Sequence, residues 1–215
     1  MFRDLLRGPR RSLVNDAIDE LLRMVEHAEH MFDTASAALL DGAPVPDISR
    51  EDQDVNVGER MVRRLIFEHL MVNPQQDLPS SLAVLGVVHD VERIGDYAKG
   101  LLELHQYSQV CSGESRYHQM CRELRDTVKP LFGKTLKGLR DSDAQACREV
   151  MRIHREVKAG TDKVMDAVMG DAEADRTALL CTIVSRYIRR VSAHLSNVAS
   201  SVVNPLDQLA HKEAI

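Results

Sequence analysis

Residues 81–104, SLAVLGVVHDVERIGDYAKGLLEL, decide the fold of this chain. Apolar side chains recur there every three or four residues, which is the spacing of one face of an α-helix. The apolar stripe consists of Val84, Val87, Val88, Val91, Ile94, Ala98, Leu101 and Leu102. We therefore expect a long amphipathic helix whose apolar side faces a core of further helices.

Three polar residues lie off this stripe on a common face. His89, Glu92 and Asp96 follow one another at spacings of three and four residues, so they stack along one side of the helix. Two neighbouring carboxylates destabilise a helix by a few tenths of a kcal/mol unless a cation neutralises them. In the same turn, Gly95 costs roughly 1 kcal/mol relative to alanine. Two such costs in one turn suggest a binding site.

The composition favours a helical protein. The 215 residues are 44% hydrophobic but only 4% aromatic, with no tryptophan. This is enough for a buried core and fits interleaved aliphatic helices better than a β-sandwich. The net charge of −5 provides no general basic field, so we expect no nucleic-acid partner.

The chain shows no apolar run long enough to span a bilayer and no signal-peptide pattern, so we expect a cytoplasmic protein. Its four cysteines are widely spaced and form no CxxC motif. Neither a zinc site built from thiolates nor a disulfide framework is therefore indicated.

The same periodicity predicts five further helices. We expect them at Val14–Leu40, Arg50–Val72, Tyr117–Leu139, from a cap at Asp141 or Ser142 to Val168, and at Ala174–Val203. Ser49 and Asp52 resemble a capping box, and Ser80 or Ser81 is expected to cap the helix of residues 81–104. Pro130 is expected to interrupt and bend its helix. No segment alternates with a period of two, so no strand is predicted.

The second half of the chain echoes the first. Residues 81–104 align with the helix at Ala174–Val203 at a constant offset, and Phe32 aligns with Phe132 in the same way. This pattern indicates a duplicated three-helix unit. We expect an all-α fold of two antiparallel three-helix bundles within one domain, residues 1–215, with repeat 1 at about 13–107 and repeat 2 at about 115–204.

The stretch Asp90-Val-Glu-Arg-Ile-Gly-Asp-Tyr-Ala98 resembles the signature helix of the PhoU family, which carries the motif E-R-I-G-D. The loop Asn73-Pro-Gln-Gln-Asp-Leu-Pro79 and the six-helix duplicated plan are similar as well. The resemblance implies surface clusters of iron or zinc at each E-x-x-x-D motif and a role in restraining phosphate uptake and signalling. The implied partners are a phosphate transporter, ABC-type or sodium-coupled, and a phosphate-responsive sensor histidine kinase.

The resemblance further implies a homodimer that meets the membrane only through its partner. The opening residues, MFRDLLR (1–7), are more similar to those of the shorter relatives found with sodium–phosphate transporters.

Several residues depart from the family pattern. In the helix of repeat 2, Arg189 stands in place of the motif glutamate and Ala193 in place of its aspartate. Lys158 and Asn56 occupy positions of the middle helices where the family usually has acid. We therefore expect metal in repeat 1, held by Glu92, Asp96, Asp52 and Asn56, and doubt a second cluster in repeat 2.

Each of these assignments has a plainer alternative. Glu92 and Asp96 are also what a solvated helix face would carry, with Arg93 and Lys99 as charge partners, and Asp52 is also a helix cap. A solvated role is favoured over ligation for His89. Arg186, Arg189 and Arg190 form either a fixed positive face for an acidic partner or an ordinary charged surface.

Other site types find less support. The cluster Glu26-His-Ala-Glu-His30 lies mostly off the apolar stripe and is better explained as an exposed helix face. No glutamate has a histidine three residues later, which excludes a ferritin-like di-iron bundle. No nucleophile elbow or phosphate-binding glycine loop is present. We expect a metal-binding regulator rather than an enzyme; the alternatives are a metal-dependent phosphohydrolase and a helical adaptor without metal.

Overall fold

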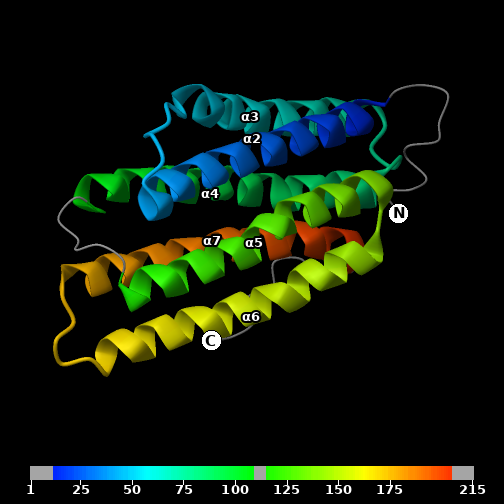
Figure 1. Ribbon diagram of the computed structural model, residues 1–215. Helices are drawn as coiled ribbons and strands as arrows, with labels where there is room; N and C mark the ends of the chain where they lie inside the picture. Colours follow the sequence, from blue (N-terminus) through cyan, green and yellow to red (C-terminus); the bar gives the residue numbers. More distant parts are fainter. Residues whose placement is uncertain (1–11, 109–114, 205–215) are drawn as a thin grey trace.

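The computed structural model describes residues 12–108 and 115–204, which form six α-helices and, within those ranges, no strand (Figure 1). The helices are α2 (Leu13–Asp41), α3 (Ser49–Val72), α4 (Leu78–Ser108), α5 (Arg116–Asp141), α6 (Ala144–Met169) and α7 (Arg176–Val203). The predicted all-α class and each of the six predicted helices are confirmed.

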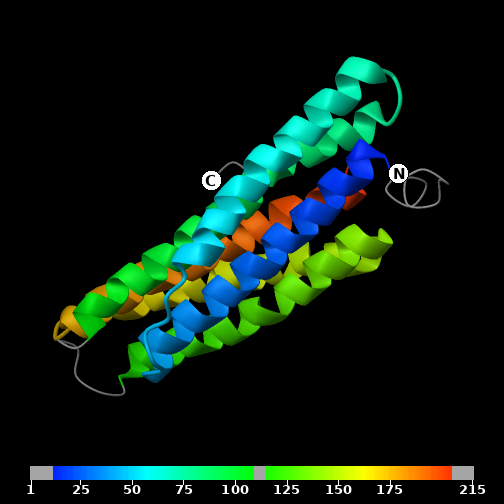
Figure 2. The same ribbon diagram turned by 90° about the horizontal axis from the view of Figure 1, so that it is seen from above.

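The helices form two units of three. Helices α2, α3 and α4 pack together in one unit, and α5, α6 and α7 in the other (Figure 1). Seen from above, all six run roughly along one long axis (Figure 2). Contacts of α4 with α7, and of α2 with α5, join the units into one bundle. The two middle helices of the units, α3 and α6, therefore lie on opposite outer sides of the molecule.

The predicted apolar stripes form the core. In α4 every member of the stripe is buried except Leu102, which is half-buried. In α2 the whole predicted stripe, from Val14 to Leu39, is buried. Burial of aliphatic side chains stabilises by about 25 cal/mol per Å² of apolar surface, so these stripes hold the bundle together.

Two pairs of aromatic rings lie at the contact between the units. The rings of Phe32 and Phe132 lie 5.6 Å apart between α2 and α5, and those of Tyr97 and His194 lie 5.6 Å apart between α4 and α7. Both pairs match residues that the sequence aligns between repeats. A two-fold relation places equivalent residues opposite each other in this way. The duplication itself stays a prediction.

The predicted helix starts need three corrections. Ser49 and Asp52 form no capping box, because Ile48 occupies the N-cap without a side-chain bond and the Ser49 N–H instead bonds Asp47 Oδ1 at 3.0 Å. Ser80 and Ser81 are buried inside α4, which begins at Leu78.

The start of α6 was also misplaced. Its cap is Asp143, not Asp141 or Ser142, since the Asp143 carboxylate accepts bonds from the Gln145 and Ala146 N–H groups at 3.0 Å. Helix α5 runs through Pro130 without a break, so the predicted interruption is wrong.

Some features of the sequence lie outside the described residues. They include the opening MFRDLLR segment and Cys111. Within the described residues, no helix has the length and apolar character that crossing a membrane requires.

Candidate functional site

The predicted acidic residues meet on one face formed by α3 and α4. Helix α3 supplies Asp52 and Glu59, and α4 supplies Glu92 and Asp96. The side chains of Glu92 and Glu59 are only 16% and 17% exposed, whereas Asp96 is 40% exposed. The expectation of a fully open surface site therefore holds for Asp96 but not for Glu92.

The glycine in the motif is buried, but its surroundings leave room for a methyl group. A Cβ on Gly95 would lie 3.6 Å from Val55 Cγ1 and 3.8 Å from the Met31 side chain. These are ordinary contact distances, so alanine would fit. The small residue is not required by a ligand approaching at this point.

Asp52, the first acidic residue of the face, is neutralised by Lys99. Lys99 Nζ lies 3.1 Å from Asp52 Oδ2, which joins α4 to α3. This bond raises the pKa of Lys99. The neighbouring Asn56 donates its side-chain amide to the Asp52 backbone oxygen at 2.7 Å. Of the two predicted α3 ligands, Asp52 is thus paired with a cation and Asn56 is bonded to its own helix.

Histidine lies between two glutamates at the centre of the face. His89 Nδ1 is 3.3 Å from Glu59 Oε1 and 3.3 Å from Glu92 Oε2. Arg63 also reaches Glu59 Oε1, at 2.8 Å. The structure therefore brings Glu59, which was not among the predicted ligands, into contact with the predicted site.

Glu92 is the least satisfied group of the face. Its Oε2 atom is buried and has no hydrogen-bond partner among the described residues, because the His89 ring nitrogen is near but not aligned for a bond. Burial raises the pKa of Glu92 above its usual value, and the charges of Asp96 and Glu59 raise it further. A buried carboxylate in this state favours a proton or an added cation.

Arginine occupies the open end of the face. Arg93 NH1 bonds Asp96 Oδ2 at 3.1 Å, and Arg93 Nε lies 3.4 Å from His89 Nε2. Asp52, Glu59 and Asp96 thus each have a lysine or arginine within 3.1 Å, whereas Arg93 Nε lies 4.0 Å from Glu92 Oε2. Among the described residues no three His, Cys, Asp or Glu side chains are arranged to hold a metal ion. A metal that binds here must displace at least one of these cations.

In the second unit, the predicted arginines lie along α7. Arg186 and Arg190 are exposed and form no ion pair with any described residue. Arg189 is 27% exposed and lies 3.4 Å from Asp162 Oδ1 of α6. Where the first unit has Gly95, this unit has Ser192, which is bonded to His154 Nδ1 at 2.9 Å.

The cluster of residues 26–30 does not assemble as a site. Glu26 pairs with Arg140 of α5 at 3.3 Å, whereas His30 lies 3.2 Å from Glu51 of α3. Its side chains thus point to different helices, as an exposed helix face would.

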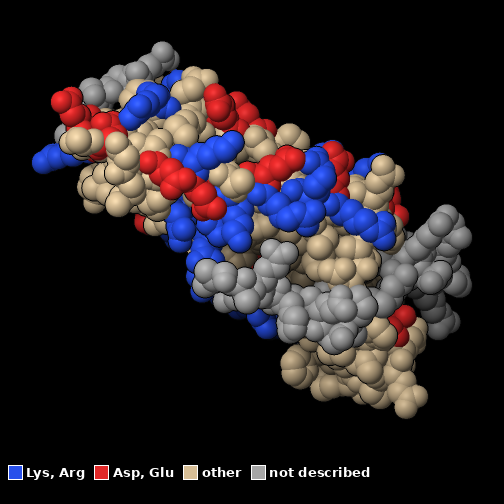
Figure 3. Space-filling model, turned by 90° about the horizontal axis from the view of Figure 1, so that it is seen from below, with Lys and Arg blue, Asp and Glu red and all other residues tan. Residues whose placement is uncertain are grey.

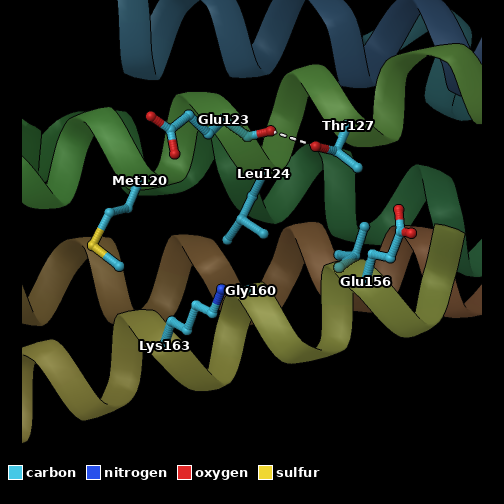
Figure 4. Close-up of a pocket in the computed structure, with 8 residues that line it drawn as sticks. Met120, Glu123, Leu124, Thr127, Glu156, Gly160 and Lys163 are labelled. Atoms are coloured by element: carbon cyan, nitrogen blue, oxygen red, sulfur yellow. Dashed lines mark hydrogen bonds between the residues drawn. The ribbon is translucent and has the colours of Figure 1, made fainter.

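A groove between α5 and α6 is lined by Met120 and Leu124 on one side and by Gly160 on the other (Figure 4). A Cβ at Gly160 would lie 2.6 Å from Leu124, so the glycine permits the close approach of the two helices. Glu156, at its edge, is paired with Arg152.

Two residues at or beside the candidate site were not predicted, although the sequence contained a signal for one of them. Glu59 lies seven residues after Asp52, which is two helical turns along the same face. Asp90, within the motif, bonds His194 Nδ1 at 2.7 Å and Asn197 Nδ2 at 2.8 Å across the two units. No local pattern reveals that contact, because its partners come from the other half of the chain.

These observations define a class: an all-α protein of two three-helix units with a carboxylate-rich face on one unit and an arginine-rich face on the other. Residues 21–104 match the family model described as "PhoU domain". The chain therefore carries a PhoU domain in its first unit, which confirms the resemblance to the PhoU family.

Solved structures of PhoU proteins have the same fold over most of the chain. The crystal structure of PhoU from Pseudomonas aeruginosa superposes with a TM-score of 0.77 at 21% identity, covering 89% of this chain and 95% of that one. The phosphate transport system regulatory protein PhoU from Streptococcus pneumoniae gives a TM-score of 0.79 at 14% identity, covering 91% and 95%. No curated protein matches the chain.

Proposed function

We propose that this protein is a cytoplasmic regulator of phosphate transport and phosphate signalling that acts through contacts with other proteins. The PhoU domain at residues 21–104 and the PhoU fold support this role. The partners we propose are a phosphate transporter or a phosphate-sensing kinase.

We further propose that the face of α3 and α4 takes a metal ion. The observation that carries this proposal is the buried, unbonded Oε2 of Glu92, which lies close to the carboxylates of Glu59 and Asp96. Carboxylate oxygens suit hard and borderline cations, and iron or zinc is the expected type. A bound cation would supply positive charge to this face.

In this proposal Glu92 is the primary ligand, with Asp96 and Glu59 beside it. His89 contacts Glu59 and Glu92, and Arg93 bonds Asp96, so these side chains turn aside when the ion binds. The charge of the face then depends on metal loading, which changes its affinity for a charged partner.

The adaptor alternative also has a specific observation in its favour. Lys99 already neutralises Asp52 and Arg93 already neutralises Asp96, so the face can remain folded without metal. The two functions differ in one measurable property, which is the metal content of the protein.

The first experiment measures that content in protein purified without chelator or metal-affinity tag. We expect bound iron or zinc in the natural sequence, loss in the E92Q variant, and no loss in E156Q, which removes an exposed carboxylate of α6. Metal-free protein, or equal content in both variants, would favour the adaptor.

A second experiment tests the pathway. Deletion of the gene is expected to raise phosphate uptake or to release phosphate-starvation signalling, and the natural sequence is expected to restore control. A phosphatase assay on the metal-loaded protein addresses the enzyme alternative, for which we expect no turnover.

A further inference from the structure

The outer surface of α6 and α7 carries excess positive charge. Figure 3 views the molecule from the side of the second unit, where lysine and arginine side chains gather along the middle of the surface. We call the following set the basic face: Arg155 and Lys158 of α6 with Arg186, Arg189 and Arg190 of α7.

Spacing and contact show that these residues share one surface. Asp162 of α6 touches Arg189 of α7 at 3.4 Å, which fixes where the two helices meet. Lys158 and Arg155 lie on the two preceding turns of the same side of α6 as Asp162. On α7, Arg186 lies three residues before Arg189 and four before Arg190, so it is a neighbour of both on the helix surface. The side chains therefore form two short rows on neighbouring helices.

The acids on these rows do not balance the cations. Asp162 is paired with Arg189, and Asp166, one turn further along α6, forms no ion pair with any described residue. The two rows thus carry five positively charged and two negatively charged side chains. Four of the five form no ion pair within the described residues. In the first unit, by contrast, each of Asp52, Glu59 and Asp96 has a lysine or arginine partner.

The chemistry of the basic face indicates what it binds. Four of its five cations are arginine, whose planar guanidinium pairs with carboxylates through two parallel bonds. Rows one helical turn apart match carboxylates placed three or four residues apart on another helix. The two exposed large apolar residues of α6 and α7, Met169 and Leu179, lie where these helices join and not among the arginines. Helices that bind a membrane surface normally also insert apolar side chains, so a protein partner fits better.

We propose that the basic face is the docking surface for an acidic helix of a partner protein, one that carries aspartate or glutamate at every turn. The inference rests on the proposed function in assuming a protein partner, and it does not depend on metal binding. Charge complementarity of this kind mainly raises the rate of encounter and selects the partner.

The test uses the full chain and a synthetic alanine-based helical peptide with glutamates along one face. A matched peptide with glutamine in place of glutamate is the control. We expect fluorescence anisotropy to show binding of the glutamate peptide at low salt, weakening as salt rises, and no binding of the glutamine peptide.

The decisive variant is R186E/R190E, and its matched control is R60E/R64E, which reverses two exposed arginines of α3. We expect the first to weaken peptide binding by about tenfold or more and the second to leave it within about twofold. Circular dichroism and thermal unfolding establish that both variants fold.

Three results would overturn the proposal. The first is that the natural chain does not bind the glutamate peptide, or that both variants lose binding equally. The second is that phosphatidylglycerol vesicles bind the basic face more tightly than the peptide. The third is that R186E/R190E abolishes self-association, which would make a second copy the partner. Control of phosphate uptake is measured in a separate experiment. If the protein does not control uptake, that result counts against the proposed function and not against the role of the basic face.

Discussion

Glu92 is a carboxylate whose surroundings disfavour its charged form. It is the most buried carboxylate of its face, and it is the one with a buried oxygen that lacks a hydrogen-bond partner among the described residues. Its neighbour Asp96, four residues on, is more exposed and bonded to Arg93. The two motif acids therefore differ in their surroundings: Glu92 has a buried oxygen without a partner, whereas Asp96 is paired with arginine.

The pH dependence of stability tests this difference. Because the pKa of Glu92 is raised in the folded state, the stability it contributes is present below its ordinary value of 4.5 and is lost as pH rises through the folded value. In metal-free protein we therefore expect E92Q to raise the free energy of unfolding at neutral pH by a few tenths to about 1 kcal/mol.

Urea denaturation at pH 7 and at pH 4 measures the effect. The gain should vanish at the lower pH, where the natural side chain is protonated, and E156Q should show no comparable gain. A loss of stability in E92Q at pH 7 would mean that the charged form of Glu92 is stabilised after all.

At the residue scale the sequence predicted which side chains share a face and that Arg93 pairs with a motif acid, but it did not predict the partner of Lys99. Spacing placed Glu92 and Asp96 together, and it named Arg93 and Lys99 as charge partners. It could not place Lys99 on Asp52, since that bond joins two helices whose register depends on the whole core. Whether a metal displaces these pairs stays a prediction.

At the scale of the helices, glycines mark where neighbouring helices approach. A Cβ on Gly100 of α4 would lie 2.7 Å from the Tyr187 ring of α7, whereas one on Gly133 of α5 would meet nothing within 4 Å. The same substitution is therefore expected to have opposite effects at the two positions.

We expect G100A to lower the free energy of unfolding by about 1–3 kcal/mol, because the added methyl group must displace Tyr187. We expect G133A to raise it by about 0.5–1 kcal/mol, because alanine favours the helix. Chemical denaturation of both variants checks the pair. Stabilisation by G100A would show that Tyr187 moves aside at little cost.

The cap of α6 provides a second test at this scale. Asp143 accepts two backbone N–H bonds, and Lys137 lies 2.8 Å from its other oxygen, which together lower its pKa. We expect D143A to lower the melting temperature and D141A, at one of the two positions first predicted, to lower it much less. Thermal unfolding of the two variants distinguishes them, and an equal loss would contradict the assigned cap.

Helix positions were predictable because apolar spacing depends on local sequence alone, and the stripe of α4 was buried as expected. The ends of the helices were less predictable from the sequence. Asp141, Ser142 and Asp143 all have capping side chains, and only the backbone path of the turn selects Asp143, with Ser142 at a positive φ of 53°. The unbroken passage of α5 through Pro130 likewise depends on packing against other helices.

At the scale of the molecule, the two units share one core and several polar links, of which Asp90 makes the one between α4 and α7. Asp90 accepts bonds from His194 and Asn197 at the contact of α4 and α7, and its side chain is only 12% exposed. His194 also stacks on Tyr97. A polar network of this kind fixes the relative position of the units, since a shift would leave buried groups without partners.

A double-mutant cycle tests the link. We expect D90A to lower the free energy of unfolding by about 1–3 kcal/mol, because it leaves the His194 and Asn197 donors without their acceptor. H194A should cost a similar amount, and the double variant less than the sum, since both remove one shared bond. The control is D54A, which removes an exposed carboxylate of α3.

The number of unfolding transitions in the D90A variant tests more directly how the two units are coupled. If the bond only fixes position within a shared core, D90A should still unfold in a single step, as small domains do. Two separate transitions would show that the units fold independently and that the Asp90 link, rather than the apolar contact of α4 and α7, couples them. The arginine-rich and carboxylate-rich faces would then be free to move relative to each other, and a partner bound to one could not influence the other through a rigid core.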